Sequence, residues 1–171
     1  MKIATHFLFA AILPRSSQVH AAVDIKHDEF VFSVPGDWLQ VKDNDPERWS
    51  FESKQRQTSV VLSIVPGMKI PKSRLVEVAK KFASIRREAE QKARPGQHLT
   101  YGDEWVELKP SGDVAEIAYA AQDESGTIFR FYGFVTQAKV LSFWVATTGR
   151  SNELSKVAFD EAFKALKFYV P

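Results

Sequence analysis

The chain has 171 residues, a formal net charge of +2 and hydrophobic residues at 44% of its positions, values that are ordinary for one globular domain. It contains no cysteine, which excludes disulfides, thiolate metal sites, a cysteine nucleophile and the acylated cysteine of bacterial lipoproteins. The near balance of charge argues against a nucleic-acid-binding protein, because such a protein needs a net basic surface.

Residues 1–21 have the pattern of a signal peptide. Lys2 gives a basic start, residues 3–13 are apolar, and Val19-His20-Ala21 offers small residues to a signal peptidase. The apolar run is too short to span a bilayer, and the alternative interpretation is a buried first element of the fold. Cleavage after Ala21 would remove Lys2 and Arg15 and leave 21 of the 23 basic residues against 21 acidic ones, so the mature chain would be formally neutral.

These features predict an exported protein. A secreted chain without cysteine and without an N-x-S/T sequon suits the bacterial periplasm better than a eukaryotic extracellular space. We expect one domain over residues 22–171, with no integral membrane segment once the leader is removed and no nucleic-acid partner.

The first half of the mature chain reads as a polar start followed by short strands. Residues 22–29 are polar and predict a mobile start. Alternation of apolar and polar residues then predicts strands at 30–34, at 38–41, around Trp49 and Phe51, and at 58–65.

The period of the apolar residues changes to that of a helix between residues 72 and 92, with Ser73 as the expected cap. The stripe expected to face a sheet consists of Leu75, Val78, Phe82, Ile85 and Ala89. On the opposite side Lys80 and Arg87, together with Arg94 just beyond the helix, suggest a basic docking surface for a partner. The alternative is a solvated helix face without a function.

Strand character resumes over residues 99–108 and is strongest over residues 114–148. Two polar breaks, at 122–126 and 136–139, are short enough for hairpin loops, so the stretch predicts a three-stranded antiparallel meander. Both faces of this meander are apolar and require cover. Its aromatic residues Phe131, Phe143 and Trp144 are expected in the core.

A second helix is predicted from Glu153 to about Lys167, with Ser151 or Asn152 as its cap. The loop that precedes it contains Gly149, Arg150 and Ser151, and free main-chain N–H groups at this helix start would suit an anion or a carboxylate. The alternative is an ordinary strand-to-helix turn.

One resemblance covers essentially the whole mature chain. The pattern F-x-F-S-V-P-G-D-W from Phe30 to Trp38, then W-S-F, a long helix, a meander with G-x-x-F-R and a final amphipathic helix, resembles the PsbP/DcrB-like superfamily. The resemblance implies an α+β fold in which an antiparallel sheet is flanked by helices, as an α/β/α sandwich. It also implies a non-enzymatic role in binding, assembly or stabilisation. Similar folds serve as the Eag chaperones of type VI secretion, which are cytosolic, and many DcrB-like members are lipoproteins, unlike this cysteine-free chain.

The motifs of common catalytic sites are absent. There is no G-x-S-x-G elbow, Walker A loop, G-x-G-x-x-G fingerprint or H-E-x-x-H helix, and the mature chain has only two histidines, His27 and His98. We therefore expect a non-catalytic protein without a cofactor or metal that binds or stabilises a partner protein. Two alternatives remain: an immunity protein that neutralises a toxin, and a hydrolase in which distant carboxylates are drawn together.

Overall fold

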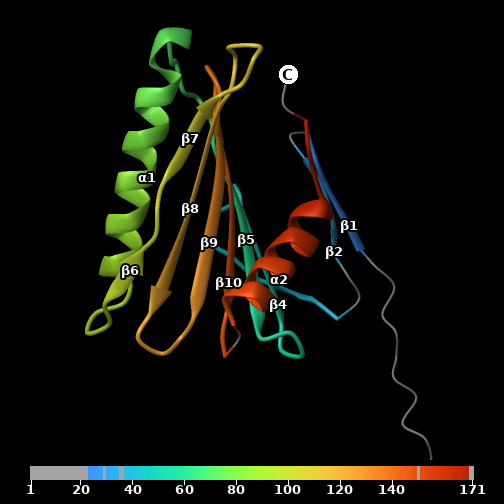
Figure 1. The fold of residues 1–171 in the computed structure, drawn as a ribbon. Coiled ribbons are helices and arrows are strands. Elements are labelled where there is room, and N and C mark those ends of the chain that lie inside the picture. The colour runs from blue at the N-terminus through green and yellow to red at the C-terminus, as the bar shows by residue number, and fades with distance from the viewer. Residues whose placement is uncertain (1–22, 29, 35–36, 150, 170–171) are drawn as a thin grey trace, which may run out of the picture.

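The computed structural model describes residues 23–28, 30–34, 37–149 and 151–169 of the chain. An eight-stranded antiparallel sheet forms the centre of the fold (Figure 1). Its strands lie in the order β3-β4-β5-β10-β9-β8-β6, and β7 pairs with β8 next to β6. They are β3 (Leu39–Val41), β4 (Arg48–Ser53), β5 (Thr58–Val65), β6 (Leu99–Tyr101), β7 (Trp105–Leu108), β8 (Ala115–Asp123), β9 (Ile128–Val135) and β10 (Val140–Thr147).

The predicted meander over residues 114–148 is confirmed as β8, β9 and β10. Phe131 of β9 lies opposite Tyr119 on one side and Trp144 on the other, so the three strands share one register. The turn between β8 and β9 is closed by Asp123, whose Oδ1 accepts hydrogen bonds from the main-chain N–H groups of Ser125 and Thr127, both at 2.9 Å. The continuous strand expected at 99–108 is instead two short strands, β6 and β7.

Helix α1 (Leu75–Lys92) follows a 3-10 turn, η1 (Lys72–Arg74), and covers one face of the sheet (Figure 1). No side chain caps either start, so the prediction of Ser73 as a cap is wrong. The fully buried apolar positions of α1 are Leu75, Ala79 and Ala83, and the two alanines allow the helix to lie close to the sheet.

The expected apolar stripe of α1 is therefore offset from the observed one. Val78 and Phe82 are only half-buried, Ala89 is exposed, and Ile85 is 53% exposed. Helical spacing identified the apolar residues correctly but could not fix the rotation of the helix, because the small residues Ala79 and Ala83 fit the sheet more closely than larger ones.

The other face of the sheet is covered by helix α2 (Asn152–Lys164) and by a second sheet. This sheet has three antiparallel strands in the order β1-β2-β11, namely β1 (Val23–His27), β2 (Phe30–Val34) and β11 (Leu166–Phe168). Two expectations are corrected here. The polar start contains strand β1, and the last helix ends at Lys164 because the next residues pair with β2.

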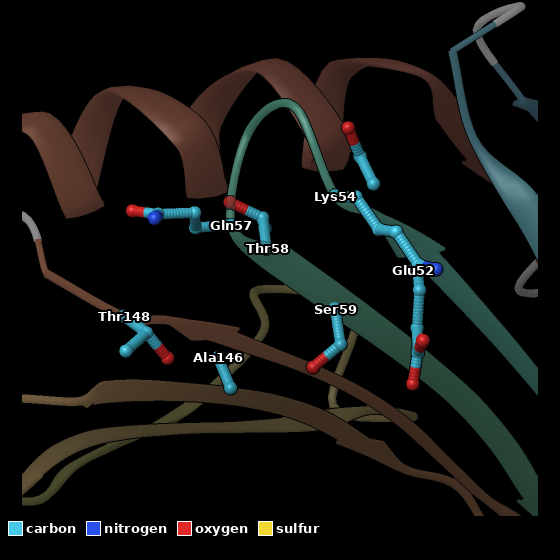
Figure 2. A pocket seen from close by; sticks show the side chains of 8 residues that line it. Glu52, Lys54, Gln57, Thr58, Ser59, Ala146 and Thr148 are labelled. Atoms are coloured by element: carbon cyan, nitrogen blue, oxygen red, sulfur yellow. The ribbon is translucent and has the colours of Figure 1, made fainter.

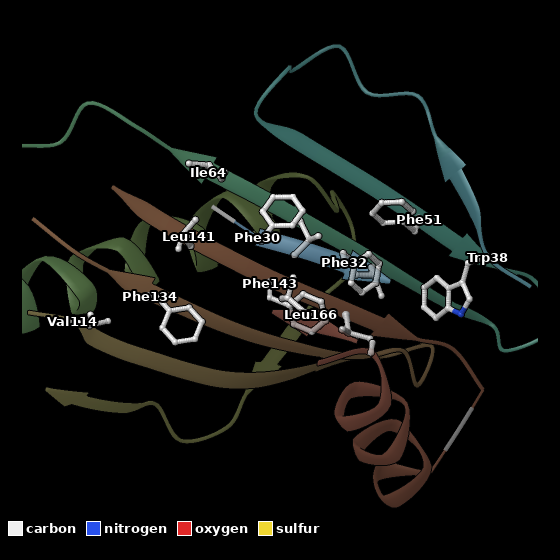
Figure 3. Close-up of a cluster of buried hydrophobic side chains, with 14 residues drawn as sticks. Phe30, Phe32, Trp38, Phe51, Ile64, Val114, Phe134, Leu141, Phe143 and Leu166 are labelled. Carbon is white, nitrogen blue, oxygen red and sulfur yellow. The ribbon is translucent and has the colours of Figure 1, made fainter. Parts of the chain in front are cut away.

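The larger hydrophobic core lies between this second cover and the central sheet. Figure 3 shows Phe30 and Phe32 of β2 facing Phe143 of β10, with Leu166 of β11 beside them. Phe32 and Phe143 are 0% exposed. The alternating pattern Phe-Val-Phe therefore turns both phenylalanines of β2 toward the core.

The predicted class, α+β with an antiparallel sheet flanked by helices, is confirmed, with the addition of a small sheet beside α2. Within the described residues, neither helix combines the length and the apolar character that crossing a bilayer requires. The proposed signal peptide of residues 1–21 lies outside the described residues and stays a prediction.

Candidate functional site

The three basic residues predicted to form a docking surface do not share one exposed face. Lys80 is exposed on α1. Arg87 turns inward: its Nη2 lies 2.8 Å from Oε2 of Glu104, and its guanidinium lies over the rings of Tyr101 and Tyr119, at 5.3 and 4.8 Å from their centroids. The side chain of Arg87 is only 27% exposed. These intramolecular contacts hold Arg87 against the sheet rather than in solvent.

Arg94 also turns toward the sheet. Its guanidinium lies 4.3 Å from the ring centroid of Phe129 and 5.9 Å from that of Trp144, and its Nη1 donates to the main-chain oxygen of Glu90 at 3.0 Å. Such stacking favours arginine over lysine, because the guanidinium is planar and weakly hydrated.

Between these two arginines, α1 buries a carboxylate. Glu90 is 7% exposed, and its Oε1 accepts a hydrogen bond of 3.0 Å from the phenol of Tyr119 and lies 3.6 Å from Nη2 of Arg86. Burial raises the pKa of Glu90 from its ordinary value, although the charge of Arg86 and the bond from Tyr119 partly oppose this shift. Burial likewise raises the pKa of Tyr119.

A pocket of about 250 Å³ opens beside this carboxylate, between the end of α1 and strands β4, β5 and β10; we call it the arginine pocket. Its lining residues are Arg48, Val61, Arg86, Ala89, Glu90, Ala93, Arg94 and Trp144. Within it Nε of Arg86, Oε2 of Glu90 and Nε1 of Trp144 are buried atoms without a hydrogen-bond partner. Trp144 as a whole is only half-buried although its Nε1 is enclosed, which corrects the expectation that it is a full core residue.

An apolar groove of about 300 Å³ lies beside the first half of α1; we call it the α1 groove. Val78, Phe82 and Ile85 contribute its helical side, and Met68 and Ile70 come from the segment that leads into the helix. Lys69, Pro71, Arg74, Glu77 and Lys81 complete the lining. Arg74 and Glu77 form an ion pair with each other at 2.6 Å. Lys80 does not line this groove.

The loop predicted to bind an anion lies at the other end of the sheet. Gly149 has a φ of 65°, a conformation that favours glycine, and Ser151 caps α2 by accepting a 3.3 Å bond from the N–H of Leu154. The predicted cap is therefore confirmed, while Arg150 lies outside the described residues. Gly149 also approaches Gln57, because a Cβ built on the glycine would lie 3.3 Å from Oε1 of that residue.

Gln57 belongs to a polar hollow of about 240 Å³ between the β4–β5 turn and the end of β10 (Figure 2). The hollow is lined by Glu52, Ser53, Lys54, Gln57, Thr58, Ser59, Ala146 and Thr148. Glu52 and Lys54 carry opposite charges, so the hollow has no surplus of charge that would attract an anion.

A further hollow of about 350 Å³ lies where α2 meets β8 and β9. Ala118 and Ala120 leave room there between the strand and the side chains of Lys156, Phe159 and Asp160. Lys156 and Asp160 pair with each other at 2.6 Å, and the lining also contains Asp103 and Arg130, which carry opposite charges.

The hydrolase alternative would require catalytic side chains to be gathered at one site. In the described part of the chain, histidine and carboxylate side chains do not gather in groups of three or more that would hold a metal ion. Glu90 is the only carboxylate that lines the arginine pocket, and glycoside hydrolysis ordinarily needs two. Asp103 and Glu104 are neighbours in a loop, and Glu104 is engaged by Arg87.

The architecture is that of the PsbP-like fold. The chain is similar to the solution structure of cyanobacterial PsbP (CyanoP) from Synechocystis sp. PCC 6803, with a TM-score of 0.60 and 14% sequence identity over 90% of this chain and 96% of that chain. A crystal structure from Bacteroides thetaiotaomicron VPI-5482 matches with a TM-score of 0.38 and 15% identity, over 82% of this chain and 45% of that chain. No protein-family model and no curated protein sequence matches the chain. The resemblance inferred from the order of motifs is thus confirmed at the level of the fold.

Proposed function

We propose that this chain is an exported periplasmic protein that binds a partner protein and carries out no catalysis of its own. The observation that supports this proposal most directly is the α1 groove, where Ile85 is 53% exposed and follows the half-buried side chains of Val78 and Phe82 along the helix. Exposed apolar surface of this kind is unfavourable in water, and it marks an interaction surface when it is hollowed and rimmed by polar residues.

The charges around the α1 groove suggest the chemistry of the partner. Lys69 and Lys81 lie at its edge, whereas the charges of Arg74 and Glu77 are paired with each other. A partner segment that inserts an apolar side chain and carries carboxylates on either side of it would match this surface. Complementary charge at the rim chiefly speeds encounter and selects partners, while the apolar contact holds the complex.

The fold is consistent with this function, since the resemblance to PsbP/DcrB-like proteins implies binding or stabilising roles. Lys80 and the loop of Gly149, Arg150 and Ser151 remain proposed secondary contacts with a partner. Arg87 and Arg94 are proposed to contribute only through their remaining exposed atoms, because their guanidinium groups already contact the protein itself.

Affinity capture from periplasmic extract tests the proposal. Three baits are compared: the wild type, Ile85→Asp, and Leu154→Asp as a matched control, since Leu154 is 50% exposed on α2. A partner should be retained by the wild type and the control and lost by Ile85→Asp. Equal retention by all three baits would contradict binding through the α1 groove, and turnover in a substrate screen that a single Asp, Glu or His substitution abolishes would favour a hydrolase.

Export is tested separately by the mass of the protein recovered from the cell envelope. Cleavage of the proposed signal peptide predicts a mature species that begins near residue 22. Recovery of the uncut chain in the cytoplasm would contradict export and return attention to the cytosolic Eag-like alternative.

A further inference from the structure

The arginine pocket contains buried hydrogen-bonding atoms that the protein itself does not satisfy. Nε of Arg86 and Nε1 of Trp144 are hydrogen-bond donors that lack a partner. Neither nitrogen can accept a hydrogen bond, so only an acceptor can satisfy them. Buried polar atoms in folded proteins are nearly always bonded, to protein or to ordered water. The two donors line one pocket together with Oε2 of Glu90, an acceptor that also lacks a partner, so the pocket has room and unmet hydrogen bonds for a small polar ligand.

The charges in the pocket leave one positive charge in excess. Nε of Arg48 lies 3.1 Å from Oδ2 of Asp43, and Arg86 faces the carboxylate of Glu90 at 3.6 Å. Arg94 instead donates to a main-chain oxygen and stacks on Trp144. Its charge is therefore not matched by a carboxylate bonded to it, and a ligand with a single negative charge would complete the balance.

The rest of the lining is apolar and small. This part consists of Val61 of β5, Ala89 of α1, Ala93 just after the helix and the indole of Trp144. A ligand with a short aliphatic body can lie against these side chains while its charged end faces the arginines. The volume of about 250 Å³ suits a small acid and excludes a large one.

We propose that the arginine pocket binds a monoanionic carboxylate carried on a short apolar group. The carboxylate oxygens accept hydrogen bonds from Arg86 and Trp144, and Arg94 supplies the compensating charge. A phosphate dianion fits less well, because it brings a second negative charge next to Glu90. The carboxylate belongs either to a free short-chain acid or to the C-terminus of a peptide, and both sources share the same recognition chemistry.

The indole N–H resonance of Trp144 in nitrogen-15-labelled protein provides a direct test. The chain has four tryptophans, and the spectrum of Trp144→Phe identifies the resonance by its loss. Butyrate should shift this resonance saturably, whereas butyramide, which has the same shape without charge, should not. A short peptide with a free C-terminus, compared with its amidated form, distinguishes the two sources. If the free peptide binds more tightly than butyrate, the natural ligand is a peptide C-terminus; if butyrate binds more tightly, it is a free short-chain acid.

Variants place the ligand within the pocket. Arg86→Gln removes a charge-assisted hydrogen bond and Arg94→Gln removes the compensating charge, so each should weaken butyrate binding at least about tenfold. Lys72→Gln is the control, since Lys72 is an exposed cation just before the same helix, pairs with Asp113 and lines neither pocket, and it should bind as the wild type does. Arg94→Lys should restore less than half of the lost affinity, because lysine keeps the charge but lacks the planar group that stacks on Phe129 and Trp144 and positions that charge.

Three results would overturn the proposal: no saturable shift with butyrate or the free peptide, tighter binding of inorganic phosphate than of either carboxylate, or unchanged butyrate binding by Arg94→Gln. If Arg86→Gln fails to fold because Glu90 loses its cation, the titration of the wild type and of Arg94→Gln still decides the outcome. The site lies apart from the lining of the α1 groove, so failure of partner capture through that groove leaves this inference intact.

Discussion

The phenol of Tyr119 donates a 3.0 Å hydrogen bond to the carboxylate of Glu90 and thereby joins strand β8 of the large sheet to helix α1. Glu90 is buried beneath the helix, and Arg86, Arg87 and Arg94 are the cations whose fields reach it. The contact therefore places a titratable group where its protonation bears on how α1 is held against the sheet.

Glu90 should make the stability of the protein depend on pH. Because burial raises its pKa in the folded state above the ordinary value of 4.5, its contribution favours folding at acid pH and diminishes as pH rises through the folded-state pKa. Urea unfolding across this range should show Glu90→Gln becoming more stable relative to the wild type as pH rises. The glutamine still accepts a hydrogen bond from Tyr119, so packing is preserved.

Tyr119→Phe provides the complementary comparison. The bond from Tyr119 lowers the pKa of Glu90, so its removal should raise that pKa further and steepen the loss of stability with rising pH. A parallel pH profile for the wild type and both variants would show that Glu90 does not titrate as its burial requires.

Asp37 should contribute a dependence of the opposite sign. Burial opposes its ionisation, but the hydrogen bonds from Arg56 and Ser53 and the charge of Arg56 outweigh that effect, and its pKa falls below 3.8. Its stabilisation is therefore complete above pH 3.8 and is lost as pH falls through the folded-state pKa. Asp37→Asn should be destabilised at neutral pH and should approach the wild type in strong acid.

Arg56→Gln should remove the same acid-pH dependence as Asp37→Asn. Arg56 bonds Asp37 at 2.7 Å and Glu161 of α2 at 2.9 Å, so it ties the β4–β5 turn to the helix. Acid unfolding monitored by circular dichroism would contradict this account if the two variants differed in the pH at which stability declines.

The core between the two sheets should be far more sensitive to truncation than the α1 side of β10. Phe143 is 0% exposed, and Phe143→Ala should destabilise the protein by about 3–5 kcal/mol. Trp144→Ala should have a smaller effect, because Trp144 is half-buried beside the arginine pocket. Denaturant unfolding of the two variants compares their losses of unfolding free energy. A larger loss for Trp144→Ala than for Phe143→Ala would contradict the assignment of the main core to the Phe143 face of β10.

The meander could be predicted because its signals are local. The strand pattern over residues 114–148 predicted Phe131 and Phe143 as core residues, and both are buried. Turn residues such as Gly126 marked the hairpin, as its φ of 81° confirms. Strand β11 could not be predicted in this way. Leu166 continues the apolar pattern of α2 and becomes a strand only because it pairs with Phe32, a residue far away in the sequence.

The arginine pocket was missed for a related reason. Arg94 was expected on an exposed surface because charged residues normally lie in water, and the pattern gave no sign of the aromatic rings of Phe129 and Trp144 beneath it. The one local signal of this site is that Arg86 lies close to the predicted apolar stripe of the helix, with Glu90 one turn later. The sequence alone cannot show that Tyr119 of another element completes the contact.

Gly133 should be intolerant of a side chain. A Cβ there would lie 3.1 Å from Cγ2 of Ile117 and from the ring of Phe131, so both packed side chains would have to shift. Gly133→Ala should destabilise the protein by about 1–3 kcal/mol. Gly102→Ala is the matched control, since its nearest atom is 3.7 Å away and it should change stability by less than about 0.5 kcal/mol. Equal melting temperatures for the two variants would contradict the tight packing at Gly133.

Reversal of charge on α1 should distinguish the expected basic face from the observed arrangement. Lys80→Glu alters an exposed residue and should leave the melting temperature within about 2 °C. Arg87→Glu should destabilise the protein by about 1–3 kcal/mol, because it replaces a cation stacked on Tyr101 and Tyr119 with an anion beside Glu104.

Thermal unfolding of both charge variants, with Arg87→Gln as an intermediate case, separates the effect of losing the stacked cation from the effect of adding a negative charge beside Glu104. Arg87→Gln loses the stacking cation but adds no like charge, so its melting temperature should lie between those of the wild type and Arg87→Glu. If Lys80→Glu and Arg87→Glu had the same melting temperature as the wild type, Arg87 would behave as a solvated residue. The exposed basic surface expected from the sequence would then regain support.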